Sequence, residues 1–321
     1  MIAQDRKGRI THRFAQLTAT ATFFLVIAGG LVTSTGSGLA VPDWPLSYGM
    51  FFPPMVGGIF YEHGHRMIAG CVVILTIALA LRLWTTEPRS WLRNTGLAAV
   101  GIIFTQAVLG GMTVLFLLPT PVSVAHAGLA MIFFCLVSSL ALLTSERWSE
   151  PLELERCRQR QPLLGLAIAT TAILYAQILL GAWMRHSGAG LAIPDFPLAF
   201  GRVLPVLESP AVRIHFAHRV GALAVTVAIA ALLAEVVRSG RETPEVARPT
   251  YLLAGLLVAQ ITLGALTIWS AKAVLPTTAH VAVGALMLML AVRISLQAGR
   301  IERLGARVAT GSLAVAKAAR A

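Results

Sequence analysis

Long apolar runs separated by short polar segments dominate the chain. Eight of these runs approach or exceed the roughly 20 residues that a helix needs to cross about 30 Å of hydrocarbon. They cover approximately residues 14–33, 62–84, 96–117, 121–144, 163–184, 213–237, 251–271 and 276–297. The pattern predicts an all-α integral membrane protein with eight transmembrane helices.

The composition supports this interpretation. Apolar residues make up 56% of the 321 positions, charged residues make up 12%, and the mean hydropathy is +0.76. A soluble domain carries about 25% charged residues, so the chain is not expected to be a soluble protein. We expect the formal net charge of +12 to lie mainly at one face of the lipid bilayer, and we expect no nucleic-acid partner.

The distribution of lysine and arginine predicts the orientation of the spans. With the N-terminus in the cytoplasm, 20 of the 26 Lys and Arg residues fall on the cytoplasmic side. The positive-inside rule therefore predicts a multi-pass protein of the bacterial plasma membrane with both termini in the cytoplasm. The two long loops, residues 34–61 and 185–212, are then expected on the outer side.

An internal duplication organises the chain. Residues 36–49 and 188–201 are identical at nine of fourteen positions. Gly29 matches Gly181 at the same offset of 152 residues, so we interpret the first apolar run as a retained span rather than a signal peptide.

Each repeat contains four spans, an even number, so both repeats enter the membrane with the same orientation. We predict two four-helix bundles related by a pseudo-two-fold axis along the membrane normal. The predicted domains are residues 1–150 and residues 151–321.

Four histidines recur in the two repeats. His65 and His126 are 61 residues apart, and His218 and His280 are 62 apart. Each pair lies at similar depth in the second and fourth spans of its repeat. Two imidazoles projecting inward at matched depth suit bis-histidine ligation of a haem. A single intramembrane histidine often only bonds a neighbouring helix, and zinc or copper is disfavoured because such sites want three or four clustered ligands.

Charged residues flank these histidines. Glu62 precedes His65 by three residues, whereas His215 holds the equivalent position before His218. On a helix each shares a face with its histidine, so Glu62 is a candidate for acid–base chemistry. The alternative is an acid in the first turn, favoured by the helix dipole.

Arg66 and Arg219 are candidates to pair with haem propionates, with interfacial snorkelling as the alternative. His12, His63 and His186 are expected at the surface. Asp43 and Asp195 are expected to cap short helices lying on the membrane.

These residues resemble the haem A synthase family over nearly the whole chain. The resemblance rests on Glu62-x-x-His65-Arg66, His126, His218-Arg219, His280, the eight spans and the loop motif Gly-Leu-Ala-Val-Pro-Asp-Trp-Pro. Some bacterial members carry a cysteine pair in the first outer loop. Residues 34–61 contain no cysteine, and neither do residues 185–212, so no thiol–disulfide role is expected in these loops.

The resemblance implies an oxidoreductase of cytochrome oxidase assembly. Its reaction is the oxidation of the methyl group at ring position 8 of haem O to a formyl group, which gives haem A. The resemblance also implies that His218 and His280 ligate a resident haem b cofactor, that His65 and His126 hold the substrate haem, and that Glu62 is catalytic. Haem O synthase and an electron acceptor in the membrane are possible partners.

The main alternative is a di-haem b-type membrane cytochrome that only transfers electrons. It explains the four histidines equally well. It does not explain why Glu62 stands in one repeat where the other repeat has His215.

Overall fold

The computed structural model consists of helices joined by short turns and two long loops. It describes residues 2–150, 163–238 and 244–318, with side chains described for residues 8–150, 163–238 and 244–306. The helices of the first half are α1 (Ile2–Ser34), α2 (Gly58–Thr86), α3 (Ser90–Leu115), α4 (Thr120–Leu143) and the short α5 (Glu146–Ser149). Those of the second half are α7 (Leu163–His186), the 3-10 helix η1 (Ala189–Leu191), α8 (Pro210–Arg238), α9 (Pro244–Trp269) and α10 (Val274–Ala318).

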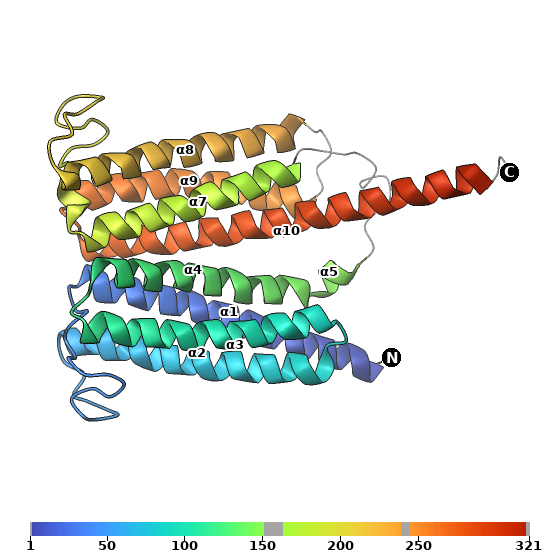
Figure 1. Ribbon diagram of the computed structural model, residues 1–321, viewed down its shortest axis with the longest axis horizontal. Helices are drawn as coiled ribbons and strands as arrows, with labels where there is room; N and C mark the ends of the chain where they lie inside the picture. Colours follow the sequence, from blue (N-terminus) through green and yellow to red (C-terminus); the bar gives the residue numbers. More distant parts are fainter. Residues whose placement is uncertain (1, 151–162, 239–243, 319–321) are drawn as a thin grey trace.

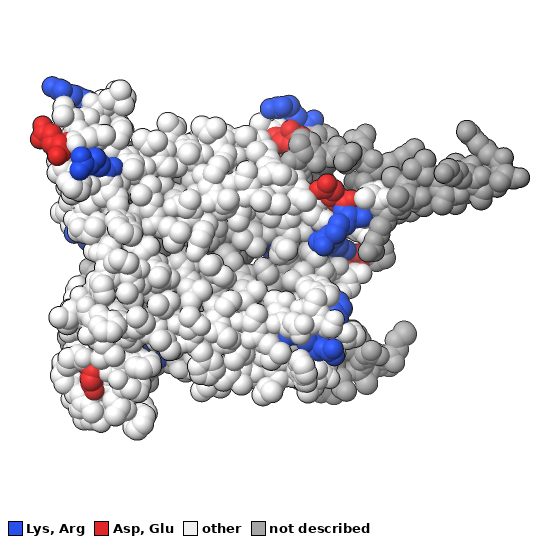
Figure 2. Space-filling model, viewed as in Figure 1, with Lys and Arg blue, Asp and Glu red and all other residues white. Residues whose placement is uncertain are grey.

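All eight predicted spans are present as helices. Each of the eight long helices has a length and composition sufficient to cross a membrane. Most predicted ends are displaced by up to seven residues, but the first helix begins at Ile2 instead of about residue 14, and the last helix runs on past residue 297 to Ala318. On the face that Figure 2 shows, the middle of the molecule is free of charged side chains, which lie towards its two ends. This distribution is what a multi-pass membrane protein requires, because an isolated charge in hydrocarbon is costly.

The long helices form two groups of four. Figure 1 shows α1–α4, coloured blue to green, in one half of the molecule and α7–α10, yellow to red, in the other. Both long loops, residues 35–57 and 187–209, emerge at one end, here called the loop end, and the two termini lie towards the opposite end. The pseudo-two-fold relation stays a prediction, and so does the domain boundary, which adjoins residues 151–162 outside the described part of the chain.

Four central helices join the two groups. α1 contacts α10, and α4 contacts both α7 and α10. The apolar core of the second group continues across this seam to Val26 of α1 and to Met131 and Phe134 of α4. Phe23 stacks on Phe134 there, with ring centroids 5.7 Å apart. The seam is therefore packed like an interior rather than like a weak contact between domains.

The two long loops follow the same backbone course. An isolated bridge joins Ser47 to Met50 in the first loop, and another joins Ala199 to Arg202 in the second. Both loops contain a cis peptide bond before the first proline after the Asp, at Trp44–Pro45 and Phe196–Pro197. The similarity seen in the sequence motif thus extends to the local conformation of both loops.

The contact of α4 with α7 depends on Gly128. A Cβ atom at this position would lie 2.7 Å from Leu179 Cδ2 and 3.1 Å from the Tyr175 hydroxyl. We expect Gly128→Leu to force the two helices apart and to lower the free energy of unfolding by about 1–3 kcal/mol. Gly101→Leu is the control, because no atom lies within 4 Å of a Cβ there. Denaturant or thermal unfolding in detergent measures the difference, and equal effects of both substitutions would contradict it.

Candidate functional site

Each of the four predicted ligand histidines packs against a glycine of the preceding long helix. Each glycine lacks the side chain that would collide with the imidazole: its Cβ would lie 3.2 Å or less from Cε1 of the ring. The pairs are Gly29 with His65, Gly110 with His126, Gly181 with His218 and Gly264 with His280. Four helix pairs therefore make the same contact, and it fixes where each ring lies against its neighbouring helix.

The histidines of each half converge near the loop end. Each lies between the seventh and ninth residue of its helix, which is about 9–12 Å from the helix start. His65 lies near His126, and His218 lies near His280. All four imidazoles are half-buried. The structure thus brings together the two predicted pairs.

Glutamines hold the second pair of rings more closely than the first. The Gln177 side-chain amide lies 3.0 Å from Nδ1 of His218 and also donates to the His218 carbonyl at 2.8 Å. Nδ1 of His280 donates to the Gln260 carbonyl at 3.1 Å. The Gln260 side-chain amide also lies 3.3 Å from Nε2 of His280. These contacts orient both imidazoles, and ligation of a metal through Nε2 of His280 requires the Gln260 amide to move.

The first pair lacks these bonds. Carbonyls of Leu25 and Gln106 lie near the rings of His65 and His126, but neither Nδ1 atom has a partner with good hydrogen-bond geometry. The Gln106 amide donates only to the His126 carbonyl, at 2.9 Å. Leu25 stands where Gln177 stands in the second half, four residues before the glycine. The ring of His65 is therefore the least constrained of the four by side-chain bonds.

Glu62 is buried and anchors the first loop. One carboxylate oxygen accepts a hydrogen bond from the Val41 backbone N–H at 2.8 Å, and the other pairs with Arg66 at 2.7 Å. In the second half, Nδ1 of His215 accepts the equivalent bond from the Ile193 N–H at 3.2 Å. Glu62 is the fifth residue of α2, beyond the first turn. Its position is therefore explained by the loop contact rather than by the helix dipole.

The two arginines bind backbone carbonyls of the loops. Arg66 donates from Nη1 to the carbonyls of Asp43 and Leu46, both at 2.8 Å. Arg219 donates to the carbonyls of Leu198 at 2.8 Å and Asp195 at 2.6 Å, and its Nε atom is buried without a partner. Each guanidinium thus fastens its loop onto the helix that carries a candidate ligand.

His63 is not a surface residue, contrary to the prediction. Its exposed fraction is 7%, and its Nδ1 atom lies 2.8 Å from the Ser47 hydroxyl. The sequence carried a signal for this pair, because the equivalent positions of the second repeat, Ala199 and Phe216, are both apolar. Both positions are polar in the first repeat, and both are apolar in the second. His12 and His186 are partly exposed.

The sequence led us to expect that Asp43 and Asp195 cap short helices, but neither residue does so. Each instead caps a turn of its own loop: Asp43 accepts the N–H groups of Tyr48 and Gly49, at 2.7 and 2.8 Å. These bonds, with that from Gly49 the strongest influence, hold the pKa of Asp43 below its ordinary value of 3.8. Asp195 accepts the equivalent bonds, which lower its pKa in the same way.

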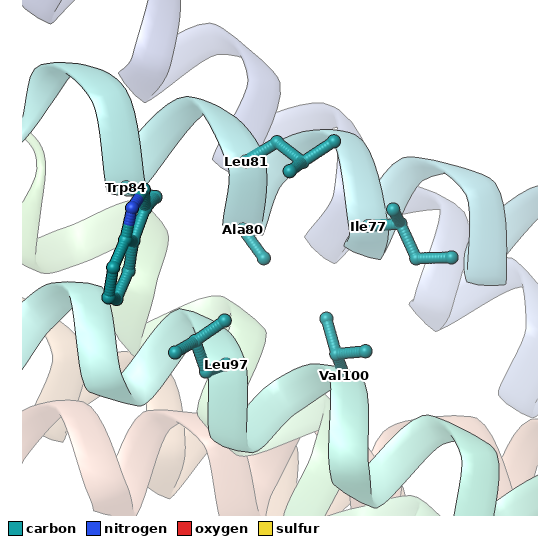
Figure 3. Close-up of a pocket in the computed structure, with 6 residues that line it drawn as sticks. All are labelled: Ile77, Ala80, Leu81, Trp84, Leu97 and Val100. Atoms are coloured by element: carbon teal, nitrogen blue, oxygen red, sulfur yellow. The ribbon is translucent and has the colours of Figure 1, made fainter.

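A groove lies on the outer surface of the first group of helices, between α2 and α3. Figure 3 shows its lining, which consists of Ile77, Ala80, Leu81, Trp84, Leu97 and Val100, and it encloses about 360 Å³. Its α2 residues come 12 to 19 positions after His65, or about 18–28 Å along the helix. The lining is almost wholly apolar, and the groove is not where the candidate ligands converge.

The residues present fit a haem in each half. Each half offers two half-buried imidazoles, and the glycine contacts leave each ring unobstructed by a Cβ atom. Within the described residues, no group of three or more His, Cys, Asp or Glu side chains gathers to hold a metal ion. The donor set therefore suits an iron macrocycle, which brings its own four nitrogens, better than zinc or copper.

The Asp43 turn makes the first loop sensitive to acid. Because the pKa of Asp43 is lowered, its stabilising effect is complete above about pH 3.8 and is lost as the pH falls through the lowered value. We expect Asp43→Asn to reduce the hydrogen-exchange protection of the Tyr48 and Gly49 amides at pH 7 and to abolish its acid dependence. Mass spectrometry of peptides from the loop measures this, and unchanged protection would contradict it.

Comparison with known proteins gives consistent matches. A model of the cytochrome oxidase assembly protein family matches residues 57–292. The heme A synthase of Geobacillus thermodenitrificans is 30% identical over 276 residues, covering 83% of this chain and 84% of that protein. That of Bacillus pumilus is 31% identical over 274 residues, covering 82% and 87%. That of Bacillus licheniformis is 34% identical over 190 residues, covering 57% and 61%.

The matched region contains Glu62 and all four histidines that pack on glycines. It also contains Arg66 and Arg219, which anchor the two loops. The family match covers well over half of the chain. The chain therefore belongs to the cytochrome oxidase assembly protein family.

Proposed function

We propose that this protein is a haem A synthase, an oxidoreductase that converts the methyl group at ring position 8 of haem O into a formyl group. The observation that carries the proposal is the pairing of imidazoles in each half, each ring packed on a glycine, in a chain whose relatives are named heme A synthase. Oxidising an unactivated methyl group needs a redox centre that side chains do not provide, and bound haem supplies it.

The second half is the proposed site of a resident haem b, with His218 and His280 as axial ligands. The hydrogen bonds of Gln177 and Gln260 to these rings support this assignment. The Gln260 carbonyl accepts the Nδ1 proton of His280, and an acceptor of this kind orients a metal ligand and increases metal affinity. A cofactor that stays bound benefits from such fixed ligands.

The first half is the proposed site of the substrate haem, held by His65 and His126. Their Nδ1 atoms lack hydrogen bonds of good geometry, and looser rings suit a haem that must enter and leave. Glu62, three residues before His65, is the only carboxylate within four residues of any of the four histidines. We therefore assign proton handling in the reaction to Glu62.

Arg66 and Arg219 lie one residue after a proposed ligand in each half. We propose that they also direct hydrogen-bond donors towards haem propionates. The Nε atom of Arg219, which has no partner, is available for this contact. The carbonyl bonds of both guanidinium groups fix their positions beforehand.

The proposed setting is the bacterial plasma membrane, with the termini in the cytoplasm and the loop end outside. The excess of Lys and Arg on the terminal side supports this orientation. Haem O is the proposed substrate, and haem O synthase and a membrane electron acceptor are the proposed partners. The product would serve terminal oxidases, in keeping with the family's description.

The proposal predicts distinct effects for the two histidine pairs. His218→Ala should abolish the haem b absorbance of the purified protein. His65→Ala should retain that absorbance and lose haem A formation. Expression with and without a source of haem O, followed by extraction and mass determination of the haems, measures both effects. Haem b alone in the unmodified protein, with haem O supplied, would instead identify a di-haem cytochrome.

Glu62 can be tested by separating its charge from its shape. Glu62→Gln keeps an oxygen that accepts the Val41 N–H but cannot take up or release a proton. We expect haem A formation to fall by about 10²–10⁴-fold, as for loss of a general acid–base group, with haem b content unchanged. Ser47→Ala is the control, because it alters the neighbouring His63 contact and keeps the carboxylate. Near-normal activity of Glu62→Gln would limit Glu62 to holding the loop.

A further inference from the structure

Arg185 lies on α7 at the seam between the two groups of helices. Its Nη2 atom donates to the Ser34 hydroxyl at 2.8 Å and to the Gly30 carbonyl at 3.3 Å, both on α1. Thr278 of α10 donates to the same Ser34 hydroxyl at 3.0 Å. A single guanidinium therefore joins a cluster to which three helices contribute.

This arginine is not part of the duplication. The equivalent position of the first repeat is Thr33, whose hydroxyl bonds only to the Gly29 carbonyl of its own helix. Arg185 is partly buried, and among the residues whose side chains are described no Asp or Glu forms an ion pair with it. By contrast, Arg66 has Glu62. A partly buried cation without an opposite charge is costly.

The position of Arg185 relates it to the haem sites. It follows Gly181 by four residues, so it shares the helix face that carries the His218 contact, one turn nearer the loop end. It also shares the Ser34 hydroxyl with Thr278, which lies two residues before His280 on α10. On the other side, its acceptor Gly30 adjoins Gly29, which packs on His65. The guanidinium thus stands beside the second site and contacts the wall of the first.

We propose that Arg185 binds a propionate of the haem held between His218 and His280, and through Gly30 and Ser34 links that haem to the wall of the other site. The inference rests on the proposed function. A carboxylate supplies the opposite charge that Arg185 lacks within the described chain, and an arginine pairs with a carboxylate through two parallel hydrogen bonds. Only the Nη2 donors are engaged by the contacts described above, so further N–H groups remain for the propionate.

The pairing has an electrostatic consequence. Ferric haem carries one more positive charge than ferrous haem, and a nearby cation therefore favours the reduced form. In a partly buried site one unit charge at roughly 10 Å changes the equilibrium by about tenfold. Arg185 raises the midpoint potential of the second haem, which makes that haem a better electron acceptor.

The test is a redox titration of the purified full-length protein followed by visible absorbance. Arg185→Gln is expected to retain haem b and to lower its midpoint potential by ~59 mV, the equivalent of a tenfold shift for a one-electron couple. Arg185→Lys keeps the charge and should stay close to the unmodified protein. Arg213→Gln is the matched control, since Arg213 is an exposed cation of the loop end, near the start of α8.

Each outcome decides the matter. An unchanged potential in Arg185→Gln overturns the inference and leaves the proposed function intact. Loss of haem from the Gln variant but not from the Lys variant supports the propionate contact. Loss of folded protein in both Arg185 variants assigns Arg185 to helix packing and overturns the inference. Unmodified protein without haem b contradicts the proposed function itself.

Discussion

The contact between a helix glycine and a histidine ring is the constraint on which the rest of the structure depends. A Cβ at any of the four glycines would lie within 3.2 Å of the ring, closer than carbon atoms pack without displacement. The absence of a side chain lets each ring lie against the neighbouring helix. Because the same contact occurs in four helix pairs, each group of helices presents two imidazoles near the loop end, and the loops, arginines and glutamines are arranged around those rings.

Charged and polar groups next to the rings anchor the loops, in addition to the turns that Asp43 and Asp195 cap within them. Arg66 and Arg219 bind loop carbonyls from the positions that directly follow His65 and His218. Movement of a loop therefore acts on the helix turn that carries a candidate ligand. Ordering the backbone of an exposed loop costs about 1–2 kcal/mol of conformational free energy per residue. The hydrogen bonds from the arginines offset part of this cost, which gives a physical reason why each loop is ordered beside its site.

The differences between the halves all concern polarity near the rings. The first half has Glu62 and the Ser47–His63 pair, where the second has His215, Ala199 and Phe216. The second half has its rings bonded at Nδ1, where the first has them unbonded. A common framework with a carboxylate and looser rings on one side, and hydrogen-bonded rings without a carboxylate on the other, matches a division between a reacting haem and an assisting haem.

The sequence by itself determined the eight spans and the identity of the four histidines. A run of about twenty apolar residues satisfies its backbone hydrogen bonds in a bilayer by forming a helix. The internal duplication shows which polar residues recur in both halves. The sequence did not determine that His63 is buried, that Asp43 and Asp195 cap loop turns, or that both arginines hold loop carbonyls. Only the tertiary structure decided these contacts, because they join groups from 5 to more than 20 residues apart, within or across a loop whose path no periodicity predicts.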